Sequence, residues 1–214
     1  MNNAIKRNAQ TTEDTNLTIS TDEIRSSESE KIEKIQFHFQ QIMETLGLDL
    51  TDNSLKGTPA RVAKMYVKEI FQGLNPEAFP KITLFDNNYG YNEALIERDI
   101  QVYSYCEHHF VPFIGKAHVA YIPSDKVIGL SKLNRIVKFF ARRPQVQERL
   151  TNDIATSLKS ILNTDDVAVY IEARHLCVAS RGVEDTKSAT ITTHFSGRFK
   201  DEGERSRFYS SIRN

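Results

Sequence analysis

The segment 105–110, Tyr-Cys-Glu-His-His-Phe, places a thiol, a carboxylate and two imidazoles side by side. Cys106 and His109 have the Cys-x-x-His spacing that lets two side chains turn toward one metal ion. Cys177 is the only other cysteine, and His175 precedes it by two positions. This pattern predicts a zinc site with the ligands Cys106, His109 and Cys177. Three protein ligands leave the fourth tetrahedral position open for water, which is typical of catalytic zinc.

The two cysteines could also have roles unrelated to a catalytic metal. A Cys-x-x-His pair alone is a weak signal, because a lone buried cysteine is usually a small core residue. A disulfide between Cys106 and Cys177 is disfavoured, since the sequence has only two cysteines and no signal peptide. His108 or His175 could instead complete a four-ligand structural site, and a single histidine often has only a packing role.

Composition limits the classes of function. The sequence has 28 Lys and Arg residues against 28 Asp and Glu, so its formal net charge is zero. A general nucleic-acid or membrane-surface binder needs a basic excess, so neither kind of partner is expected. No apolar run approaches the ~20 residues of a membrane span. The N-terminus lacks the apolar stretch of a signal peptide, so a cytoplasmic location is expected.

The elements that must position these residues begin with an N-terminal helical region, 27–74. Residues 1–26 are polar and are expected to be disordered, because they bury too little apolar surface to offset their ordering entropy. Ser27 and Glu30 have capping-box spacing ahead of apolar residues that recur at helical intervals. Thr58 is interpreted as the N-cap of a second helix, with proline in its first turn.

A catalytic domain of strands and helices is expected over residues 75–214. Its expected strands are 82–84, 96–104, 111–122, 167–173 and 186–195, and its expected helices are 130–140, 145–162 and 201–212. The segment 105–110 falls at the turn between two strands, where a rigid sheet can aim loop side chains. Strands joined by hairpins indicate an α+β fold, an antiparallel sheet with helices on one face. Its open edges would attract partners, so an oligomer is expected.

Cations and a hydroxyl on two further segments suit a phosphorylated ligand. Ser131, the expected N-cap, lies with Lys132 and Arg135 at the start of one helix, where free backbone N–H groups also favour a phosphate. Arg181 lies four residues after Cys177 and brings another cation close to the expected metal. A solvated helix surface is the alternative for such residues.

Three more residues stand at the starts of helices. Gln147 and Glu148 open the helix that follows the proline at position 144. A carboxylate there can simply favour the helix dipole. If the pair faces a pocket, it suits the amino edge of a purine, because an unpaired buried carboxylate would penalise the wrong base. Arg61 lies in the first turn of an earlier helix, where a surface role is the default and an anion is also favoured.

Five segments together resemble the GTP cyclohydrolase I family, the zinc-dependent enzymes that open pterin biosynthesis. The segments are 57–65, 106–110, 129–135, 143–150 and 175–182. The resemblance covers about residues 30–213, and residues 1–26 match nothing. Ala179 and Ser180 are a mild departure within the last segment, where the family pattern varies.

The resemblance implies a tunnelling fold, in which the antiparallel sheets of several subunits join into a barrel. It also implies a homodecamer of two stacked rings of five, with active sites between subunits. The implied reaction converts GTP and water into 7,8-dihydroneopterin triphosphate and formate, the first step of pterin and folate biosynthesis. Two alternatives remain: another purine or pterin enzyme of the same fold, or a non-catalytic oligomer stabilised by zinc.

The resemblance also implies roles for single residues. The three candidate ligands would hold Zn²⁺, which activates water near neutral pH. His175 would protonate nitrogen 7 of the guanine, and an imidazole suits that task near neutral pH. His108 would act as a second acid or base with Ser131 during sugar-ring opening.

The remaining implied roles concern the binding of GTP. Gln147 and Glu148 would recognise the guanine edge. Four cations would hold the triphosphate: Lys132, Arg135, Arg181 and, from a neighbouring subunit, Arg61. Holding both ends of GTP would place carbon 8 of the purine at the metal.

Overall fold

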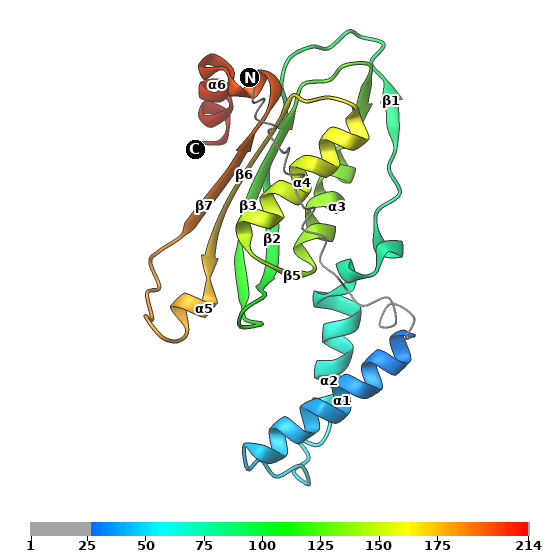
Figure 1. Ribbon diagram of the computed structural model, residues 1–214, viewed down its shortest axis with the longest axis vertical. Coiled ribbons are helices and arrows are strands. Elements are labelled where there is room, and N and C mark those ends of the chain that lie inside the picture. The colour runs from blue at the N-terminus through cyan, green and yellow to red at the C-terminus, as the bar shows by residue number, and fades with distance from the viewer. Residues whose placement is uncertain (1–26, 214) are drawn as a thin grey trace, which may run out of the picture.

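A computed structural model describes residues 27–213 of the chain (Figure 1). The expectation of disorder for residues 1–26 lies outside the described residues. The helices are α1 Glu28–Thr45, α2 Thr58–Met65, α3 Leu130–Ala141, α4 Gln147–Leu162, α5 Leu176–Ala179 and α6 Glu202–Ile212. The strands are β1 Leu84–Asp86, β2 Leu95–Cys106, β3 Pro112–Tyr121, β4 Lys126–Ile128, β5 Pro144–Gln145, β6 Val167–His175 and β7 Thr190–Phe195.

The first two helices form a pair below the sheet in the view of Figure 1. The predicted capping box at the start of α1 is confirmed: Ser27 Oγ accepts from the Glu30 N–H at 3.3 Å, and the Glu30 carboxylate accepts from the Ser27 N–H at 2.7 Å. Thr58 is not the N-cap of α2, which is Gly57. Its hydroxyl instead accepts from Arg61 at 2.8 Å. The helix continues directly into a π-helical turn, Tyr66–Ile70.

The main sheet has five strands in the order β5-β2-β3-β6-β7. The pairs from β2 to β7 are antiparallel, as predicted. The short β5 departs from this pattern, because it runs parallel to β2 with Cys106 opposite Gln145. β1 and β4 form a separate antiparallel pair, and the sequence predicts neither β4 nor β5. Because β3 is antiparallel to both neighbours, β2 and β6 run in the same direction and end at the same edge of the sheet.

The core lies between the sheet and the helices α3 and α4, which cover one face of it (Figure 1). Leu133 and Ile136 of α3 and Leu150 and Ile154 of α4 are fully buried there. Each contributes about 1.5–3 kcal/mol of hydrophobic stabilisation. These contacts make the sheet a rigid support for the turns at its edge.

The prediction that all helices lie on one face of the sheet is wrong at one end. Phe208 of α6 packs against Ala120 and Ala168, which alternate along their strands with residues of the main core and therefore face the other way. The face of the sheet that carries the main core is already occupied by α3 and α4, so the aromatic residues of α6 are buried against the opposite face. A further correction concerns α3: its N-cap is Gly129, so Ser131 is its second residue. No helix within residues 27–213 combines the length and the apolar character that spanning a membrane requires.

Candidate metal centre

Cys106 and Cys177 meet because of the strand order. Cys106 is the last residue of β2, and Cys177 lies in α5, directly after β6. β2 and β6 are both neighbours of β3, so their ends lie two strand spacings apart, about 10 Å. The turn after β2 and the short helix after β6 bring the side chains across that gap. The thiols of these residues are both free rather than paired in a disulfide.

The three predicted ligands form one group. The ligand atoms of Cys106, His109 and Cys177 all lie within 4.8 Å of one another. Cys106 Sγ is 3.7 Å from His109 Nδ1. Two ligands of a tetrahedral zinc ion, with bonds of about 2.3 Å to sulfur and 2.0 Å to nitrogen, lie roughly 3.6 Å apart. The donor set and its spacing therefore fit a zinc-sized ion without a change of the fold.

A fourth protein ligand does not join this group among the described residues. His108 Nδ1 lies 3.8 Å from Cys106 Sγ, but its ring does not come within reach of all three ligand atoms. His175 directs its Nε2 to Gln147 Oε1 at 2.8 Å. The geometry thus favours an open site over the closed four-ligand structural site.

Burial shifts the pKa values of two groups at the centre, Cys177 and His175. Burial raises the pKa of the Cys177 thiol, and the neighbouring Cys106 side chain raises that pKa further. Two adjacent thiolates would repel each other, whereas a bound dication favours both ionised sulfurs. Burial also lowers the pKa of His175, an effect that the nearby charge of Glu148 opposes. The charge of Arg181 acts to lower the pKa of Cys177, so Glu148 and Arg181 both lie close enough to influence the centre.

The turn that carries His109 is tight and is held from outside the sheet. The N–H of Phe110 donates to Cys106 O at 2.8 Å, and Phe110 has a left-handed φ of +55°. Such a conformation is uncommon for a bulky residue and persists only where the surroundings enforce it. The ring of Phe110 packs edge-on against Phe71 at 5.2 Å, and Tyr66 lies 6.2 Å away. The π-helical turn after α2 therefore supports the metal-ligand turn.

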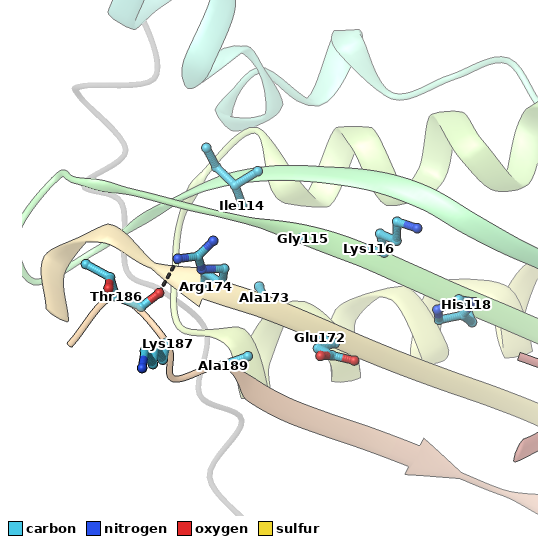
Figure 2. Close-up of a pocket in the computed structure, with 10 residues that line it drawn as sticks. All are labelled: Ile114, Gly115, Lys116, His118, Glu172, Ala173, Arg174, Thr186, Lys187 and Ala189. Carbon is cyan, nitrogen blue, oxygen red and sulfur yellow. Dashed lines mark hydrogen bonds between the residues drawn. The ribbon is translucent and has the colours of Figure 1, made fainter. Parts of the chain in front are cut away.

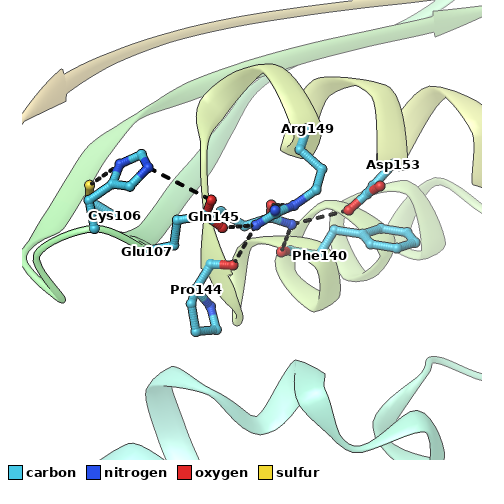
Figure 3. Close-up of polar contacts among 8 residues, drawn as sticks. Cys106, Glu107, Phe140, Pro144, Gln145, Arg149 and Asp153 are labelled. Carbon is cyan, nitrogen blue, oxygen red and sulfur yellow. Dashed lines mark hydrogen bonds and ion pairs between the residues drawn. The ribbon is translucent and has the colours of Figure 1, made fainter. Parts of the chain in front are cut away.

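An ion pair with Arg149 holds Glu107, the residue that follows Cys106 in this turn (Figure 3). Arg149 of α4 contacts the Glu107 carboxylate through Nη2, which also donates to Pro144 O at 2.9 Å. Arg149 Nε donates to Gln145 Oε1 at 2.8 Å, and Gln145 Nε2 in turn donates to the Asp153 carboxylate at 3.2 Å. The Glu107 N–H donates to Gln145 O at 3.0 Å. The parallel strand β5 and this ion pair together fix the backbone between Cys106 and the two histidines.

Replacing Arg149 by methionine is expected to lower the free energy of unfolding by about 2–3 kcal/mol, because it removes the ion-pair partner of the half-buried Glu107 carboxylate and the donor to Gln145 Oε1. Urea denaturation of the metal-loaded protein measures this. Lys138→Met is the control, since Lys138 is exposed on α3; its change should stay within about 0.5 kcal/mol. Equal effects of the two substitutions would show that the ion pair has no special part in stability.

Three of the predicted site residues, one expected in catalysis and two in substrate binding, do not lie near the metal group of the same chain. They are on the first turns of α3: Ser131, Lys132 and Arg135. On the same stretch of helix, Asn134 donates to Glu97 near the start of β2 at 2.9 Å. Cys106 is nine residues further along β2, which at about 3.3 Å per residue corresponds to roughly 30 Å. Within one chain these side chains and the metal group occupy opposite ends of the sheet.

Arg61 makes only local side-chain hydrogen bonds within the described residues. Its guanidinium donates to Ser54 O at 3.0 Å and to Thr58 Oγ1 at 2.8 Å, both within its own helix and the preceding loop. Gln147, by contrast, is close to the centre but buried, with its amide bonded inside the protein. The sequence did not indicate the pairing of Glu107 with Arg149, because the two residues are 42 positions apart and carry no joint motif.

A pocket of about 670 Å³ lies elsewhere, on the sheet face opposite α3 and α4 (Figure 2). Lys116, His118, Glu172 and Arg174 line it, and the Arg174 guanidinium donates to Thr186 O. None of the predicted site residues belongs to its lining. The pocket is therefore separate from the metal group.

Known proteins are similar to the chain over most of its length. The family model described as GTP cyclohydrolase I matches residues 35–213. A protein named GTP cyclohydrolase 1 from Flavobacterium johnsoniae is 58% identical over 187 residues, which is 87% of this chain and 84% of that protein. Proteins of the same name from Aeromonas salmonicida and Yersinia enterocolitica are 59% and 56% identical over 173 and 181 residues, covering 81% and 84% of this chain and 79% and 82% of those proteins.

Proposed function

We infer the function from one premise: this chain belongs to the GTP cyclohydrolase I family. It has the activity of that family and is a hydrolase that opens the imidazole ring of the guanine in GTP. GTP and one water give formate and 7,8-dihydroneopterin triphosphate, the first step of pterin and folate biosynthesis. The observation that carries this conclusion most directly is the family match over residues 35–213, which includes the whole metal group.

The metal is proposed to be Zn²⁺, held by Cys106, His109 and Cys177. Two thiolates and an imidazole are the soft and borderline donors that zinc prefers. The 3.7 Å separation of Cys106 Sγ and His109 Nδ1 fits two ligands of one tetrahedral ion of this size. When bound, zinc with three protein ligands supplies an open position at which a water is activated near neutral pH.

The protein's own acids and bases carry the proton transfers. The purine ring resists addition of water at carbon 8 until nitrogen 7 is protonated, and His175 is proposed to donate that proton. His108, exposed beside the metal ligands, is proposed to move protons with Ser131 when the ribose ring opens and rearranges. Imidazoles suit both tasks, because this side chain can gain and lose a proton near neutral pH.

Recognition of GTP is proposed to involve both ends of the molecule. Glu148 is exposed beside His175 and can accept hydrogen bonds from the guanine amino edge. The triphosphate is assigned to four exposed or half-buried cations: Lys132, Arg135, Arg181 and Arg61. A purine fixed at one end and phosphates fixed at the other would orient carbon 8 toward the metal.

We propose that the site is completed by neighbouring copies of this chain. Asn134 of α3 contacts Glu97, and Glu97 lies roughly 30 Å from Cys106 along β2, which is too long for one GTP to bridge within a single chain. The sheet also has open edges at β7 and along β2 beyond the two-residue β5. Joining these edges into an intersubunit barrel, as in the decameric tunnelling fold, would pair the free backbone groups and bring the α3 cations of one copy to the metal of another.

A GTP assay tests this function. The zinc-loaded protein should release formate and a fluorescent pterin in equal amounts from GTP alone. Removal of the metal with a chelator should lower the rate by at least about 100-fold, and added Zn²⁺ should restore it. Pterin formation without formate would indicate another reaction. An undiminished rate in protein shown to be metal-free would reject the metal's part in catalysis.

A further inference from the structure

Gln147 begins α4 and is only 1% exposed. Its Nε2 lies 3.1 Å from Ile171 O, 3.0 Å from Thr190 O and 3.1 Å from Thr192 Oγ1. The two carbonyl oxygens can only accept hydrogen bonds, so the nitrogen end of the amide must face β6 and β7. The amide oxygen, Oε1, therefore faces the His175 ring.

This orientation determines which nitrogen of His175 carries hydrogen. Gln147 Oε1 lies 2.8 Å from His175 Nε2. Because an amide oxygen can only accept, Nε2 must be the donor. The neutral ring is then the Nε2–H tautomer, in which Nδ1 carries no hydrogen.

A second contact holds the plane of the same ring. The Phe113 ring stacks on His175 with centroids 4.7 Å apart and planes 12° from parallel. Phe113 is fully buried in the core, and its backbone lies opposite His175 in the β3–β6 register. The stacked Phe113 ring thus limits the tilt of the imidazole, while the hydrogen bond to Gln147 limits its rotation.

We propose that Gln147 is a positioning residue for His175, and that it does not recognise the guanine. It holds the imidazole as the Nε2–H tautomer, which leaves Nδ1 as the ring nitrogen that Gln147 does not bind. A glutamine suits this position because it offers an acceptor to the histidine and a donor to the strand carbonyls at once. Glutamate would set an oxygen against two carbonyl oxygens. The proposal rests on the proposed function in one respect, the role of His175 as the acid.

Steady-state kinetics of Gln147→Met separates the two possible roles. Methionine keeps the length of the side chain but forms none of the four hydrogen bonds of the Gln147 amide. Loss of the correct tautomer should lower kcat by about 100-fold, while KM for GTP stays within about threefold and the zinc content is unchanged. Thr192→Val is the matched control: it removes one of three acceptors of the Gln147 amide and leaves the contact to His175, so kcat should change less than about threefold.

The tautomer itself can be observed in the unaltered protein. Nitrogen-15 NMR of histidine-labelled, zinc-loaded protein should show Nε2 protonated and Nδ1 free for neutral His175, with the signal assigned by its absence from His175→Asn. Gln147→Met should add the Nδ1–H form. An Nδ1–H tautomer in the unaltered protein would overturn the proposal, as would a Gln147→Met enzyme with raised KM and normal kcat.

These outcomes remain distinct from a failure of the proposed function. Normal turnover by His175→Asn would remove His175 from catalysis, whereas the NMR result would still decide whether Gln147 selects the tautomer. If Gln147→Met does not fold, the measurement on the unaltered protein alone supports or refutes the assignment.

Discussion

Replacing Cys177 by serine is expected to abolish zinc binding and GTP turnover together. The variant loses one of three ligands, and a serine hydroxyl does not ionise near neutral pH as a metal-bound thiol does. Turnover should fall by at least about 1,000-fold, and the zinc content after dialysis should fall in parallel. Metal analysis and the formate assay on the same preparation measure the two quantities.

Val178→Ser is a suitable control for this experiment. Val178 is the next residue of the same short helix and has a side chain 37% exposed. The control introduces the same hydroxyl without touching a ligand, so zinc content and turnover should both be retained. High activity of a metal-free Cys177→Ser protein would be incompatible with the proposed ligand set. Circular dichroism of each variant would separate loss of metal from loss of fold.

Two inactive variants are expected to regain activity when they assemble together. His175→Asn disables the proposed acid at the metal centre, and Lys132→Ala disables a triphosphate contact at the far end of the sheet. If one site uses His175 of one copy and Lys132 of another, an equal mixture should leave about one quarter of the sites intact. Turnover should then rise from the background of either variant alone to about a quarter of the unaltered rate.

A control pair makes this result specific. His175→Asn and Cys177→Ser both alter the metal centre of their own chain, so no mixture of the two yields a complete centre. Activity should stay at background for this pair. If mixed oligomers of verified composition also show no recovery with Lys132→Ala, the substrate residues act within single chains and the proposed intersubunit site is wrong.

Local features could be predicted from the sequence. The capping box of Ser27 and Glu30 depends on residues three positions apart, and it is present. The strands expected at 96–104, 111–122 and 167–173 appear as β2, β3 and β6 with ends moved by no more than two residues. Alternating and helical apolar spacing predicts such elements because each pattern matches one backbone geometry.

Long-range features required the tertiary structure. The parallel pairing of β5 with β2 and the packing of α6 on the second face depend on which surfaces the remaining elements leave free. The predicted N-caps Thr58 and Ser131 are wrong by one and two residues, because Gly57 and Gly129 occupy the N-cap positions, whereas the helix start expected at residue 130 is confirmed. A glycine can take the N-cap conformation without a side-chain hydrogen bond, so the hydroxyl of a nearby Thr or Ser does not by itself identify the N-cap.

The amino-acid sequence by itself determined the candidate metal ligands and the elements that carry them, because two rare thiols and a fixed spacing leave few other uses for them. Only the folded chain decided what surrounds those ligands. Gln147 reaches His175, and Arg149 reaches Glu107, through contacts between residues 28 and 42 positions apart. Such contacts depend on strand order and register, and no local pattern in the sequence encodes them.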